Sequence, residues 1–64
     1  MPDDAAELTS VASQLDGLTQ RVTAAADRAQ AAGEESLAAD LYEIERALRA
    51  GTRRLGAVVR RLDD

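Results

Sequence analysis

Apolar residues recur at intervals of three and four along two stretches of the chain. The positions of the first stretch are Leu8, Val11, Leu15, Leu18, Val22, Ala25 and Ala29. Those of the second stretch are Leu37, Leu41, Ile44, Leu48, Gly51, Leu55, Val58 and Leu62. This spacing places an apolar stripe along each of two α-helices, in the heptad pattern of helices that pack side by side. The two stripes are out of phase, which predicts two helices rather than one continuous rod.

Gly33 lies in the gap between the two stripes. Glycine readily adopts the left-handed conformation that ends many helices, and the two glutamates after it suit the positive end of a following helix. We therefore predict an all-α fold, an antiparallel, coiled-coil-like hairpin that forms one domain over residues 1–64. Its helices are expected to cover about 4–32 and about 34–63, with the turn near Gly33.

The small size of the chain makes self-association an expected source of stability. A chain of 64 residues buries only a marginal core, and without cysteine or histidine it has no disulfide or Cys/His metal site to reinforce it. One flank of the apolar stripes carries small, mostly uncharged residues with Tyr42 at its edge, and exposed strips of this kind usually mark an interface. We predict that this small flank joins two copies into a four-helix bundle. Its residues are Ala5, Ala12, Thr19, Ala26, Ala38, Tyr42, Thr52 and Val59.

Gly51 occupies the apolar stripe of the second helix, although glycine inside a helix costs roughly 1 kcal/mol relative to alanine. Folding the chain about Gly33 places Leu15 opposite Gly51. We expect the missing side chain to make room for Leu15 or for the backbone of another helix. A kink or local fraying at Gly51 is the alternative.

The arginines are concentrated in the last third of the chain. Residues 1–45 hold two arginines against ten acidic residues, whereas residues 46–64 hold six arginines against two. A basic stripe of this kind suits an acidic protein surface or the phosphates of a nucleic acid, and an ordinary solvated face is a third interpretation. The predicted stripe faces outward and consists of Arg46, Arg49, Arg53 and Arg60.

The residues of the chain offer little for catalysis. Histidine, cysteine and lysine are absent, and there is no glycine-rich phosphate loop. Asp40, Glu43 and Glu45 are clustered but lie off the apolar stripe, which favours a solvated face over a metal site. We therefore expect no enzymatic activity, no cofactor and no metal.

These observations predict a small adaptor or regulatory subunit that acts through protein–protein contacts and associates with itself, most simply as a dimer. The alternative is an accessory nucleic-acid-binding protein that uses the arginine stripe. No apolar run approaches the roughly 18 residues of a membrane-spanning helix, and the acidic N-terminus lacks the apolar segment of a secretory signal. We therefore expect a cytoplasmic protein without membrane contact.

Overall fold

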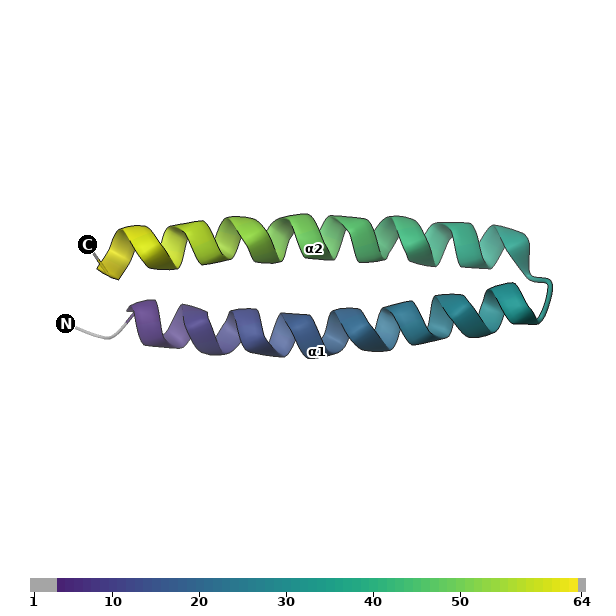
Figure 1. Cartoon of the computed structure of the whole chain (residues 1–64), viewed down its shortest axis with the longest axis horizontal. Coiled ribbons are helices and arrows are strands. Elements are labelled where there is room, and N and C mark those ends of the chain that lie inside the picture. Colours follow the sequence, from purple (N-terminus) through teal and green to yellow (C-terminus); the bar gives the residue numbers. More distant parts are fainter. Residues whose placement is uncertain (1–3, 64) are drawn as a thin grey trace.

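Two antiparallel α-helices joined by a short turn make up the fold (Figure 1). The structure, a computed structural model, describes residues 4–63. Helix α1 spans Asp4–Ala31 and helix α2 spans Glu35–Asp63. The predicted all-helical hairpin is confirmed, while residues 1–3 and 64 of the predicted domain lie outside the described residues. The hairpin is long and narrow, with Cα extents of 50 × 14 × 11 Å.

Gly33 ends α1 in a Schellman motif. Its backbone φ is 79°, in the left-handed region. The N–H of Gly33 donates to the carbonyl of Gln30 at 3.0 Å, and the N–H of Glu34 donates to the carbonyl of Ala29 at 2.9 Å. These two bonds satisfy carbonyl groups that the end of a helix otherwise leaves without partners. The carbonyl of Glu34 then accepts from the N–H of Ala38 at 2.9 Å, which begins α2.

Replacing Gly33 with alanine is expected to destabilise the protein by about 1–2 kcal/mol, because L-residues are strained in the left-handed region. A Cβ atom at Gly33 would meet nothing within 4 Å, so the cost comes from the backbone alone. Gly17 is the matched control, because it also has open space but an ordinary helical φ. Gly17→Ala should instead stabilise the protein by up to about 1 kcal/mol. Denaturant unfolding measures both changes, and equal effects would contradict this account of the turn.

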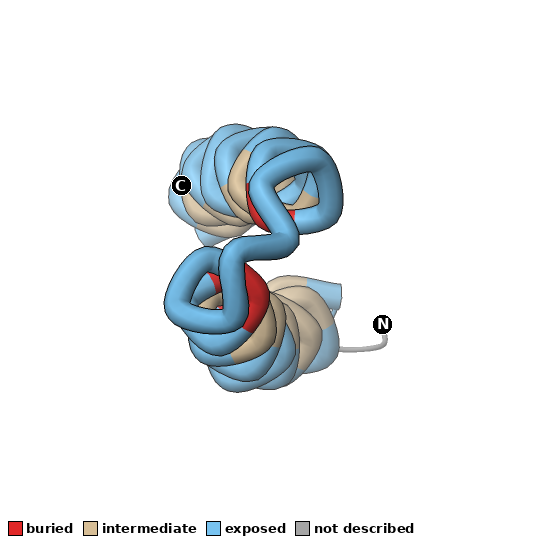
Figure 2. The backbone as a smooth tube through the Cα atoms, turned by 90° about the vertical axis from the view of Figure 1, so that its right-hand side faces the viewer, coloured by how far each residue is buried: buried red, intermediate tan, exposed pale blue. Residues whose placement is uncertain are grey.

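The residues buried between the helices are small. The described residues below a tenth exposure are Thr19, Ala26, Ala29 and Ala38. Figure 2 shows that the buried segments of the two helices face each other near the turn. The large aliphatic residues Leu18, Leu37, Ile44 and Leu62 are 46–51% exposed. The most deeply buried residues of the hairpin are therefore alanine and threonine, and four of the large aliphatic side chains remain about half exposed.

The contact between the helices is rotated away from the predicted apolar stripe. Leu18 and Ile44 belong to that stripe but are exposed, whereas Ala26 and Ala38 of the small flank are buried. The rotation is partial, because Ala29 of the stripe is also buried and most other stripe residues are half-buried. The separation of packed helices depends on the size of the side chains at their contact. Small residues let the two backbones approach closely, and the longer aliphatic side chains on the neighbouring positions then project to one side.

Thr19 can be buried because its hydroxyl is satisfied within its own helix. The hydroxyl donates to the carbonyl of Leu15 at 2.6 Å. Thr52 makes the equivalent bond to the carbonyl of Leu48 at 2.8 Å. Among residues 4–63, no buried side-chain nitrogen or oxygen lacks a hydrogen-bond partner. The two threonines thus add polar atoms to the contact, and each hydroxyl has a hydrogen-bond partner. A buried hydroxyl without a partner would cost about 1–3 kcal/mol.

The helices are paired about a point just past Glu34 rather than about Gly33. Tyr42 bonds to Asp27 across the hairpin, and Glu45 lies beside Thr23. The register is thus shifted from the predicted one, and the expected contact between Leu15 and Gly51 is wrong. Gly51 is exposed, and a Cβ atom there would meet nothing within 4 Å. Helix α2 continues through this position without interruption.

Candidate interaction surfaces

The small flank lies inside the hairpin. Three of its residues, Thr19, Ala26 and Ala38, are buried between the helices. The others are partly buried, namely Ala5, Ala12, Tyr42, Thr52 and Val59. The prediction that this flank forms an exposed strip is therefore wrong, because the same small residues already close the contact between α1 and α2. Self-association itself stays a prediction.

A group of polar side chains connects the two helices on one side of the hairpin. The hydroxyl of Tyr42 on α2 donates to the carboxylate of Asp27 on α1. One turn further along α2, the carboxylate of Glu45 accepts from Arg49, with N–O distances of 2.9 and 3.0 Å. The Glu45 side chain is only 19% exposed. We call this side, defined by Asp27, Tyr42, Glu45 and Arg49, the polar face.

These contacts shift two pKa values in opposite directions. The hydrogen bond to Asp27 raises the pKa of Tyr42, because it holds the phenolic proton, and partial burial and nearby negative charge act in the same direction. The pKa of Glu45 is lowered, first by hydrogen bonding from the Thr23 hydroxyl and to a smaller extent by hydrogen bonding from Arg49. The Thr23 hydroxyl also lies 3.1 Å from the carbonyl of Thr19, so its single hydrogen serves one of two acceptors.

The ionisation of Tyr42 offers a direct test of the register, because Tyr42 is the only aromatic residue of the chain. We expect an ultraviolet pH titration to place its pKa above the ordinary range of tyrosine. Asp27→Asn should lower that pKa, because it removes the charged acceptor across the hairpin. Asp16→Asn removes an exposed acid from the same helix and should leave the pKa unchanged. The same tyrosine pKa in the wild type and in Asp27→Asn would mean that the helices are paired differently.

The opposite side of the hairpin is apolar. A shallow groove there is lined by Leu18, Val22, Ala25 and Leu41, with two arginines at its rim. Ile44 follows Tyr42 by two residues, which is a rotation of about 200° around a helix axis, so it lies away from the polar face. We call this side, defined by Leu18, Leu37, Ile44 and Gly51, the apolar face. The sequence pattern pairs these residues within the hairpin and places the exposed strip on the small flank instead.

The arginine stripe is exposed along α2, but half of it is paired within its own helix. Arg46 lies 3.6 Å from Glu43, and Arg49 lies 2.9 Å from Glu45. These are the two ion pairs among residues 4–63. Arg53 and Arg60 are exposed and belong to neither of them.

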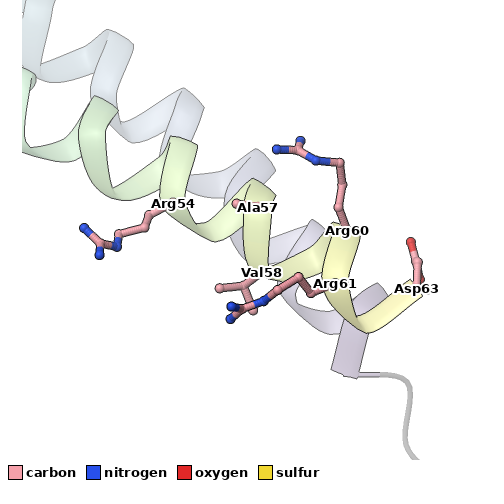
Figure 3. Close-up of a pocket in the computed structure, with 6 residues that line it drawn as sticks. All are labelled: Arg54, Ala57, Val58, Arg60, Arg61 and Asp63. Atoms are coloured by element: carbon pink, nitrogen blue, oxygen red, sulfur yellow. The ribbon is translucent and has the colours of Figure 1, made fainter.

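Further arginines stand beside the apolar residues at the C-terminal end of α2. Arg54 and Arg61 extend on the side of Val58, whereas Arg60 extends away from them (Figure 3). All of these residues line one open pocket with Ala57 and Asp63. The apolar side of the hairpin therefore has a basic border at this end, separate from the outward stripe.

Within the part of the chain that the structure describes, no group of three or more histidine, cysteine, aspartate or glutamate residues is arranged to hold a metal ion. Neither of the two described helices combines the length and the apolar character that crossing a membrane requires. No family model, curated protein or solved structure matches the chain.

Proposed function

We propose that this chain is a non-enzymatic, self-associating helical hairpin, two copies of which form a four-helix bundle. It acts through protein–protein contacts as a small adaptor or regulatory subunit. The observation that carries the proposal is the exposure of large aliphatic residues, since Leu18, Leu37 and Ile44 are 46–48% exposed while the buried set is three alanines and a threonine. Full burial of a leucine or isoleucine side chain contributes about 1.5–3 kcal/mol. In the single hairpin these side chains are only about half buried, so much of that stabilisation is not realised.

The surface area of the hairpin supports a second chain. Its accessible surface is 4757 Å². A compact monomer of 6.8 kDa exposes about 4000 Å². The larger surface belongs to an elongated hairpin, which has a long side free to take a second chain.

The arginine stripe supports an acidic partner in addition to a second copy. Ion pairing within α2 partly neutralises Arg46 and Arg49, and it leaves Arg53 and Arg60 available to an outside anion. The alternative function is accessory nucleic-acid binding through the same stripe, which the positive charge near the C-terminal end of α2 favours. Nucleic-acid binding that persists near physiological salt, with a steep salt dependence, would support this alternative.

Sedimentation velocity on the full chain tests the proposed function. The expected result is a species with the mass of two chains, which dissociates as the protein is diluted. A species with the mass of one chain at every concentration would refute self-association. Arg53→Gln together with Arg60→Gln serves as a control, because these exposed changes should leave the mass unaffected.

A further inference from the structure

We propose that the apolar face binds a second copy of the chain with the turns of the two hairpins at the same end of the bundle. The proposal rests on the self-association proposed above, and it adds the surface and the orientation. The orientation follows from which residues lie at the same level along the hairpin, and the hydrogen-bonded pair Asp27–Tyr42 defines those levels.

The size of the apolar side suits a second copy. The hairpin is 50 Å long and 14 Å wide between Cα atoms, which gives a face of about 700 Å². A standard interface buries about 800 Å² on each partner. The same surface on both partners is also what a twofold dimer requires. The polar face is a poorer candidate, because covering it would remove water from Glu45 and Arg49.

In the proposed orientation, the twofold axis runs parallel to the helices, and α1 of one copy lies on α2 of the other. Such an axis keeps every residue at its own level, so the register of the hairpin also sets the register between copies. A residue of one copy then faces the residue of the other copy that lies as far beyond the turn as it lies before it, with the turn centred midway between Asp27 and Tyr42. Large residues meet small ones, because Leu18 faces Gly51 and Ala25 faces Ile44. The open space beside Gly51 receives the Leu18 side chain of the second copy.

Charges beside the apolar face are complementary in the same register. Glu7 of one copy lies at the level of Arg61 of the other, and Arg28 lies at the level of Asp40. All four are exposed in the single hairpin, and none takes part in an ion pair among residues 4–63. Attraction at both ends of the interface therefore favours a second copy over an unrelated apolar partner.

The reverse orientation fits less well. A twofold axis perpendicular to the helices would place the turns at opposite ends, with α1 on α1 and α2 on α2. Because Leu18 and Gly51 share a level, pairing Leu18 with its own copy also pairs Gly51 with its own copy. One side of the interface would then be crowded and the other would contain a gap, which close-packed interfaces avoid.

A distance between spin labels tests the orientation. The chain contains no cysteine, so Ser36→Cys introduces one unique labelling site beside the turn. Pulsed dipolar spectroscopy on the labelled protein should give an interchain distance below about 30 Å, since two helix layers about 10 Å apart separate the labels. A distance near the 50 Å length of the hairpin would overturn the proposed orientation.

Substitutions on the two sides of α2 test the surface. Ile44→Glu should weaken dimerisation at least tenfold in sedimentation equilibrium, because it places like charges in the apolar face. Ala39→Glu adds the same charge at an exposed position outside that face and should change the dissociation constant less than twofold. A wild-type dimer that Ile44→Glu leaves intact would overturn this surface but not self-association. A wild type that is always monomeric would overturn both.

Gly51→Leu provides a second variant in case Ile44→Glu perturbs folding. Nothing lies within 4 Å of the added Cβ position, so the hairpin itself can accommodate a side chain there. The larger residue would instead occupy the space assigned to Leu18 of the second copy. We expect a helical protein with dimer affinity reduced at least tenfold, and unchanged affinity would contradict the pairing of Leu18 with Gly51.

Discussion

Dilution of this protein should unfold it. The buried residues of the single hairpin are three alanines and one threonine, and four large aliphatic side chains are about half exposed. A domain of this size has little stability of its own, so we expect the proposed second copy to supply much of the total. When a dimer unfolds to two free chains, each tenfold dilution lowers its stability by about 1.4 kcal/mol. A thousandfold dilution should therefore remove about 4 kcal/mol and most of the helical circular dichroism signal.

The variant Ile44→Glu is the control for this experiment. If it no longer dimerises, its helical signal should be lower than that of the wild type at high concentration and should not depend on dilution. A wild-type protein that keeps its full helical signal and its melting temperature over the whole range would show that the single hairpin is stable alone. The exposed aliphatic residues would then need another explanation.

Ala26→Leu should be the most damaging single substitution among the small residues of the contact. Ala26 is 0% exposed and lies where the two helices approach each other. A leucine there would have to push the helices apart or take a strained conformation, at a cost of about 1–3 kcal/mol. Denaturant unfolding at one fixed protein concentration measures the loss.

Ala50→Leu is the matched control, because Ala50 is an exposed alanine within a helix. Its effect should stay within about 0.5 kcal/mol, as for most surface substitutions. If the two leucine variants were equally stable, the contact between the helices would not pass through Ala26. The hairpin would then close on the stripe that contains Leu18 and Ile44 instead.

The two helices and the turn could be predicted because the signals for them are local. The apolar stripes repeat at helical intervals, and the phase break between them contains Gly33. A left-handed residue at the end of a helix is usually a glycine, and Gly33 has a φ of 79° in the structure. None of these inferences depends on how the helices are rotated about their own axes.

The rotation of the helices could not be obtained from hydrophobicity alone. A modest rotation of α1 about its own axis replaces Leu18 with Thr19 at the contact between the helices. The apolar pattern predicts that the larger residue, Leu18, is the buried one. The structure buries the smaller one, and in the same arrangement Tyr42 lies within hydrogen-bond distance of Asp27. The sequence does contain a sign of this rotation, because small residues occur at every seventh position, beginning with Ala5, Ala12 and Thr19. The sequence prediction places these residues at a contact between chains, whereas the structure places them between the helices of one chain.

The role of Gly51 depended on the same choice. In the predicted register it faces Leu15 of its own chain, whereas the structure leaves it exposed with open space beside it. A shift in the centre of the hairpin from Gly33 to just past Glu34 moves every facing pair, so a small error in the turn changes all predicted partners. The shift is seen in the cross-helix hydrogen bond between Tyr42 and Asp27, which the apolar pattern does not report.

In the proposed dimer, Leu18 of one copy packs against Gly51 of the other. Isotope-filtered nuclear magnetic resonance on a mixture of labelled and unlabelled chains reports only contacts between different copies. We predict nuclear Overhauser effects between the Leu18 methyl groups of one chain and the Hα atoms of Gly51 in the other. Interchain signals that instead connect the polar faces, through Tyr42 or Arg49, would contradict the account.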